Sequence, residues 1–123
     1  MAIEKTSEDI LLVELPFAGA KMAEELNTVR EMISEQRTSD VILDFFKVEL
    51  ISSSHISTLI VLRGMLQNAG HQLVLCNVKV VTKGIFTMAG LRNIFTFAKN
   101  KQTAFSILRK LKLPTLERTG VTK

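Results

Sequence analysis

The feature that most constrains the fold is a short apolar run, Val41 to Phe45, in a chain of 123 residues. Four of its five residues are apolar, and the run is far too short to cross a bilayer. Such runs are typical of strands that are buried on both faces of a sheet. The polar segment from Arg37 to Asp40 supplies a turn before it. We therefore predict a central strand here.

Helix-like and strand-like segments alternate around this run. Ile10 to Leu15 reads as a strand that Pro16 stops. The segment from Ala20 to Gln36 has apolar residues at spacings of four, three and four, which places them on one face of a helix. These residues are Met22, Leu26, Val29 and Ile33.

The second half of the chain repeats the alternation. A helix with apolar residues Ile56, Leu59, Ile60, Leu62 and Leu66 is expected to end near Gly70. A buried strand from Gln72 to Cys76, a helix from Val80 to Ala89, a short edge strand from Ile94 to Ala98 and a helix from Gln102 to Leu111 follow. In the helix from Val80 to Ala89, the side chains of Val81, Ile85 and Met88 fall on one stripe.

This order predicts an α/β fold, with a mixed sheet of about four to five strands covered by about four helices. The first strand, Ile10 to Leu15, is a candidate for antiparallel entry into that sheet. We expect one domain over residues 1–112 and a basic, flexible tail over residues 113–123.

Composition excludes several function classes. The net charge is +4, but residues 1–98 balance at −2 and residues 99–123 at +6, so the basicity is a C-terminal feature. With no Tyr or Trp for base stacking, nucleic-acid binding is not favoured. The sequence shows no membrane span and no signal-peptide run. The single cysteine, Cys76, agrees with a reducing compartment, and we expect a cytoplasmic protein.

Enzyme signatures are missing. His55, His71 and Cys76 lack the spacing of zinc ligands, and Cys76 lies inside an apolar strand, where a thiol behaves as a small core residue. Neither Gly64 nor Gly70 belongs to a phosphate-binding loop. We therefore expect no cofactor, no metal and no catalytic activity.

A serine run, Ser52 to Ser54, follows an extended segment and precedes an amphipathic helix. Its side chains thus gather at the positive end of that helix. The run fits a helix N-cap, which needs no function beyond stability, and it fits a regulatory phosphorylation site equally well.

The surrounding pattern resembles the STAS domain family, which includes the bacterial anti-sigma-factor antagonists. Three passages carry the resemblance, namely residues 41–59, 69–78 and 85–95. The first resembles the family's pattern of an apolar strand ending in Asp, a short link, the motif Asp-Ser-Ser/Thr-Gly and a Leu-rich helix, and the last resembles its Gly-Leu signature. Together they cover about residues 41 to 98.

Carried over by position, Asp44 matches the acid at the strand end, Ser53 the serine that a partner kinase phosphorylates, and Ser54 its neighbour. The family's Asp falls on Ser52 and its Gly on His55. The resemblance thus implies a partner-binding set of these five residues. We expect His55 to be an exposed residue of the first helical turn, where its bulk would obstruct a partner's close approach.

The leading hypothesis is a protein-binding signalling module that is released from its partner when Ser53 is phosphorylated. The resemblance implies an anti-sigma factor or a related serine kinase of the histidine-kinase-like ATPase class as partner, and a PP2C-type phosphatase to reset the switch. The sequence leaves open whether the protein forms a homodimer. The alternative is a non-phosphorylated scaffold or subunit of a sensory or lipid-transport assembly. A third hypothesis is a nucleotide-binding or catalytic flavodoxin-like domain with its site near Asp44 and Ser53.

Overall fold

The computed structural model describes residues 3–6, 9–17, 19–36 and 39–111. They form one five-stranded sheet and four helices. The strands are β1 (Ile3–Lys5), β2 (Ile10–Glu14), β3 (Asp40–Asp44), β4 (Leu73–Cys76) and β5 (Thr96–Ala98). The helices are α1 (Gly19–Gln36), α2 (Ser53–Asn68), α3 (Val80–Met88) and α4 (Lys101–Leu111). The predicted tail, residues 113–123, lies outside the described residues.

The strands lie in the order of the sequence, from β1 to β5. Strands β2 to β5 are parallel, with Leu12 opposite Ile42 and Ile42 opposite Val74. The central strand predicted over Val41 to Phe45 is confirmed as β3. Antiparallel entry of the strand at Ile10 is wrong, because β2 pairs parallel with β3 and the antiparallel strand is β1, which the sequence did not predict.

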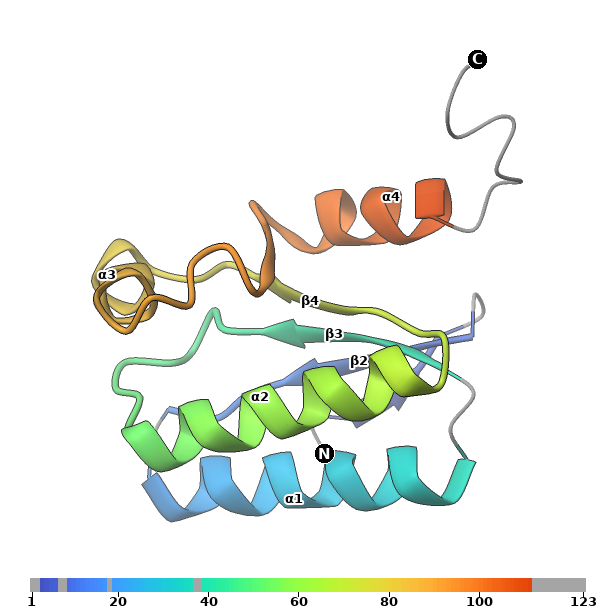
Figure 1. Cartoon of the computed structure of the whole chain (residues 1–123), viewed down its shortest axis with the longest axis horizontal. Helices are drawn as coiled ribbons and strands as arrows, with labels where there is room; N and C mark the ends of the chain where they lie inside the picture. The colour runs from blue at the N-terminus through green and yellow to red at the C-terminus, as the bar shows by residue number, and fades with distance from the viewer. Residues whose placement is uncertain (1–2, 7–8, 18, 37–38, 112–123) are drawn as a thin grey trace.

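The two faces of the sheet are covered unequally. Helices α1 and α2 lie side by side on one face, and α4 lies on the other (Figure 1). Alternate residues of the inner strands pack into the two cores: Leu11 and Leu43 face α1 and α2, whereas Leu12 and Ile42 face α4. Since both faces are buried at β2, β3 and β4, these strands are mainly apolar runs, as the sequence indicated.

Two helices carry apolar residues that lie outside the core. Ile60 of α2 is exposed. In α3, the stripe of Val81, Ile85 and Met88 points away from the core, and the buried residues of this helix are Thr82 and Phe86. Helix α3 lies at the end of the sheet where β4 ends, so only one narrow side of it packs on the domain (Figure 1). None of the helices in the described part of the chain has the length and apolarity needed to cross a membrane.

Candidate functional site

The loops that follow β2, β3 and β4 meet at one end of the sheet, because these strands are parallel. The loop between β3 and α2 leads into the serine run. The N–H of Glu49 donates to the carbonyl oxygen of Phe17 at 3.0 Å, which ties this loop to the one after β2. Lys79 Nζ donates to the carbonyl oxygens of Phe46 and Val48, both at 2.9 Å, and pairs with Glu49 Oε2 at 3.2 Å. The start of α2 is therefore held from both sides.

Asp44 holds the loops after β3 and β4 in place through hydrogen bonds of its buried side chain. Its side chain is buried at the end of β3, and its Oδ1 accepts hydrogen bonds from the N–H of Phe46 at 3.0 Å and from Asn77 Nδ2 at 2.9 Å. Asn77 has a left-handed backbone (φ 56°), which asparagine tolerates better than most residues. Asp44, one of the predicted partner-binding residues, thus lies beneath the surface and shapes the loops above it.

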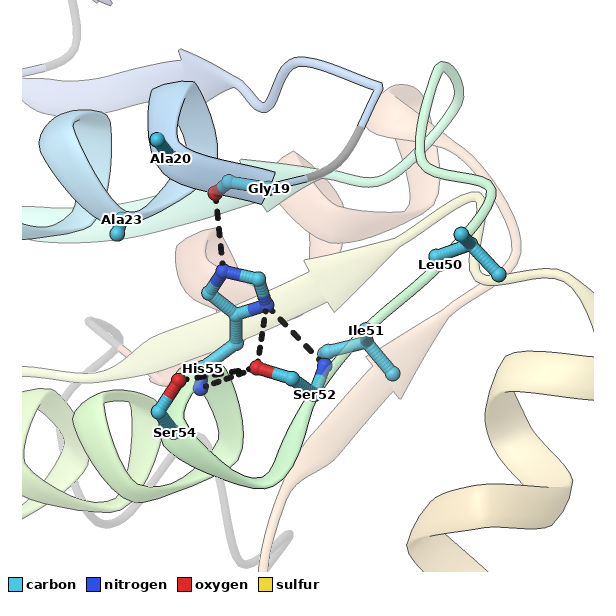
Figure 2. Close-up of a pocket in the computed structure, with 8 residues that line it drawn as sticks. All are labelled: Gly19, Ala20, Ala23, Leu50, Ile51, Ser52, Ser54 and His55. Carbon is cyan, nitrogen blue, oxygen red and sulfur yellow. Dashed lines mark hydrogen bonds between the residues drawn. The ribbon is translucent and has the colours of Figure 1, made fainter.

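Ser52 is the N-cap of α2, and His55 completes a capping box with it. The backbone of Ser52 is extended (φ −108°, ψ 169°), and its Oγ accepts from the N–H of His55 at 3.4 Å. In return, His55 Nδ1 accepts from the N–H of Ser52 at 3.1 Å (Figure 2). The third helical position of a capping box usually holds Glu or Gln, and here the ring of His55 accepts the same hydrogen bond from the N-cap N–H.

The contacts of His55 determine which of its ring nitrogens carries the proton. Nε2 lies 3.1 Å from the carbonyl oxygen of Gly19 in α1. A carbonyl only accepts, so Nε2 donates, and Nδ1 is left to accept from the N–H of Ser52 and from Ser52 Oγ at 3.1 Å. The neutral ring with its proton on Nε2 satisfies all these contacts.

The expectation that His55 is an exposed residue is wrong. The residue is only 7% exposed, and its ring points toward Gly19 of α1 instead of standing over the surface (Figure 2). The bulk that replaces the family's glycine is therefore taken up between α1 and α2, where it joins the starts of these two helices.

The structure separates the three serines by what their hydroxyl groups do. Ser52 caps the helix, and Ser54 Oγ lies 3.0 Å from Ser52 Oγ, so both belong to one hydrogen-bonded group. Ser53 is the first residue of α2 and is exposed. Within the described residues its hydroxyl group forms no hydrogen bond. Of the three, Ser53 is therefore the one that can react or bind without loosening the cap.

A pocket of about 640 Å³ opens beside the serine run, between the starts of α1 and α2. No Asp, Glu, Lys or Arg side chain lines it. The lining residues are Gly19, Ala20, Ala23, Leu50, Ile51, Ser52, Ser54 and His55 (Figure 2). Sequence reasoning missed this pocket, and its one signal was the group of small residues at the start of α1, which leaves room between the helices.

The remaining candidate groups lie apart from this site. His71 Nδ1 contacts Asp40 Oδ1 at 3.2 Å at the opposite end of β3, so the two histidines are not brought together. Cys76 is fully buried, as predicted, and burial, aided by the Asp44 carboxylate, raises the pKa of its thiol to about 12. Among the residues that the structure describes, no cluster of His, Cys, Asp or Glu could hold a metal ion.

Comparison with known proteins agrees with this architecture. Several solved structures share the fold. One is an anti-sigma-factor antagonist (STAS) domain protein from Planctomyces limnophilus, with 16% identity, TM-score 0.75 and coverage of 87% of this chain and 97% of that one. Another is RsbS from Moorella thermoacetica, with 19% identity, TM-score 0.77 and coverage of 89% of this chain and 94% of that one. The unphosphorylated anti-sigma factor antagonist SpoIIAA is similar at 12% identity, TM-score 0.68 and coverage of 90% and 97%.

At these identities the solved structures establish the fold alone. Compared by sequence, no curated protein matches the chain. The profile of the STAS domain, in contrast, matches residues 4–104, which is most of the chain. The protein therefore belongs to the STAS domain family.

Proposed function

We propose that the protein is a signalling module that binds a partner protein around the start of α2 and releases it when Ser53 is phosphorylated. The observation that carries the proposal is that the three serines have different structural roles. Ser53 is exposed at the first position of a 16-residue helix, while Ser52 keeps the cap. A kinase could thus modify the surface without removing the group that starts the helix.

The electrostatics of this position suit a switch. A phosphate adds a charge of about −1.5 to −2, which the positive end of a helix tolerates, so the domain stays folded. The adjacent pocket has no charged side chain in its lining. Phosphorylation of Ser53 would therefore turn an uncharged, largely apolar surface into a negative one. A partner that inserts an apolar side chain there and carries acidic residues nearby would be repelled.

Family membership supports a partner over a substrate, because the STAS domain is a regulatory and binding fold without enzymatic activity. The partner we propose is an anti-sigma factor or serine kinase of the histidine-kinase-like ATPase class, with a PP2C-type phosphatase that removes the phosphate in the cytoplasm. The resemblance of residues 41–59 to the family's phosphorylated motif supports this class.

The test uses a purified serine kinase of the histidine-kinase-like ATPase class from the same organism. The protein is incubated with that kinase and ATP, and the modified residue is located by mass spectrometry. Ser53→Ala should abolish the modification, and Ser53→Asp should weaken binding of the kinase by about tenfold or more. Ser106→Asp, the same change on an exposed residue of α4, is the matched control and should bind like the wild type. No phosphate on Ser53, together with full binding by Ser53→Asp, would refute the switch.

The capping box favours one alternative. Ser52 and His55 replace the family's Asp and Gly, and here both serve the stability of α2. The module could then be a constitutive scaffold or subunit of a sensory or lipid-transport assembly. In that case Ser53→Ala and Ser53→Asp both leave complex formation unchanged.

A further inference from the structure

Helix α3 presents large apolar side chains to solvent on its outer side. Val80, Val81 and Met88 are 86%, 76% and 91% exposed, respectively. The side that packs on the domain consists of Thr82 and Phe86. Isolated exposed apolar residues are ordinary, but three on one short helix form a surface of the kind that marks an interaction site.

A glycine lies in the middle of this apolar surface. At 100° per residue, Gly84 lies opposite Thr82 and Phe86, between Val80 and Met88, which are one turn away on either side. Apart from its chain neighbours and the backbone of its own helix, no atom lies within 4 Å of the position that a Cβ at Gly84 would occupy. The packing of the domain therefore does not require glycine here, although glycine weakens a helix. The outer surface of α3 has a notch between two projecting side chains.

The charges beside this surface are mostly positive, and Glu49, a carboxylate that reaches the start of α3, is paired with Lys79 at 3.2 Å. Between Glu49 and Glu117 the sequence contains no Asp or Glu, so α3 and everything after it in the described structure lack a carboxylate side chain. Lys83 lies beside the apolar surface, with its Nζ 5.5 Å from the centre of the Phe97 ring. Arg92 is exposed just beyond the end of α3. The rim of the surface is thus cationic.

We propose that the outer face of α3, formed by Val80, Val81, Gly84 and Met88, is a second docking surface that binds an amphipathic helix of a partner protein with acidic residues beside its apolar stripe. The apolar centre and the cationic rim match such a helix in both respects. The notch at Gly84 lets its backbone or a side chain approach α3 closely. This inference does not depend on phosphorylation of Ser53.

Two other occupants fit the surface less well. A second copy of the chain would meet it across a two-fold axis and set Lys83 and Arg92 against the same cations. An anionic membrane would match the charge, but a fluid lipid surface does not insert a defined side chain or backbone into the notch at Gly84. Proteins that bind at the membrane interface also favour Trp and Tyr, and this chain contains neither.

The probe is a short labelled helical peptide with leucine on one face and glutamate on the other, followed by fluorescence anisotropy. A peptide with lysine in place of glutamate tests the charge. Met88→Glu and Gly84→Leu should each weaken binding of the glutamate peptide by about tenfold. Gly64→Leu is the matched control, because Gly64 in α2 also has open space at its Cβ position. This control and Ser53→Asp should bind like the wild type, and circular dichroism checks that every variant is folded.

Three measurements would overturn the inference. The first is an absence of binding to the glutamate peptide, or equal binding of the two peptides. The second is binding to phosphatidylserine vesicles that Gly84→Leu strengthens, since added apolar area favours a membrane, whereas a filled notch disfavours a packed helix. The third is a dimer in sedimentation equilibrium that Met88→Glu dissociates. Because Ser53→Asp leaves peptide binding intact, a failure here is separate from a failure of the phosphorylation switch.

Discussion

Replacing His55 with alanine should destabilise the whole domain, although His55 lies beside the proposed regulatory serine. The ring connects two helices: its Nδ1 accepts from the N–H of Ser52, and its Nε2 donates to the carbonyl oxygen of Gly19. Alanine removes both contacts, so the N–H of Ser52 and the carbonyl oxygen of Gly19 lose their partner. Unlike a surface substitution, this change should therefore lower the free energy of unfolding.

The size of the effect follows from these contacts. Each lost hydrogen bond costs about 0.5–1.5 kcal/mol, and the two together cost about 2 kcal/mol. Alanine returns about 0.5 kcal/mol through its higher helix propensity. The net loss for His55→Ala is then about 1.5 kcal/mol, which lowers Tm by about 5 °C in a domain of this size. Gln at position 55 can still close the capping box, so His55→Gln should lose only about half as much.

Urea and thermal unfolding, followed by circular dichroism, measure these differences. The slope of the urea transition should not change, because the unfolded surface is the same. A loss below about 0.5 kcal/mol for His55→Ala would show that the ring is dispensable. Equal losses for the alanine and glutamine variants would show that the capping contact contributes nothing.

Three further changes test other parts of the structure. Gly84→Ala should raise the free energy of unfolding by about 0.5–1 kcal/mol, because alanine favours a helix more than glycine does. Gly90→Ala should lower it by about 1 kcal/mol, because Gly90 has a φ of 75°, which alanine disfavours. Urea unfolding measures both differences. Asp44→Ala removes the acceptor for Asn77 Nδ2 and should cost about 2 kcal/mol in the same assay, with faster hydrogen exchange in the loop before α2. The thiol of Cys76, whose pKa rises from 9.0 to about 12, should react with iodoacetamide at pH 8 only as fast as the domain unfolds. Because the unfolded thiol ionises first, the stability it contributes is present below about pH 9 and is lost as the pH rises toward 12.

Sequence patterns predicted the elements better than their surroundings. The apolar runs from Val41 to Phe45 and from Gln72 to Cys76 predicted the central strands, because a strand that is buried on both faces does not alternate between polar and apolar residues. Strand β1 was missed, since Ile3 is the one apolar residue among its three. In α3 apolar residues lie on nearly every side, so periodicity found the helix but not the side, Phe86, that the sheet covers.

The candidate site was predictable only in its local part. A serine run before an amphipathic helix predicts a cap from sequence alone. The burial of His55 depends on the Gly19 carbonyl, 36 residues earlier in the chain, and no local pattern contains such a contact. The pocket beside it arises in the same way, because it forms only where the starts of α1 and α2 meet.

The two departures from the family's motif, Ser52 and His55, act as one feature. A capping box needs both partners: the Ser52 hydroxyl accepts from the N–H of His55, and the ring accepts from the N–H of Ser52. A glycine at position 55 would leave the second bond unmade and would cost helix stability as well. The substitutions thus strengthen the start of α2 and leave Ser53 exposed between them. Because the capping box holds the first turn of α2, this turn can accept a negative charge at Ser53 without fraying. The departures from the motif are therefore compatible with a switch at this position.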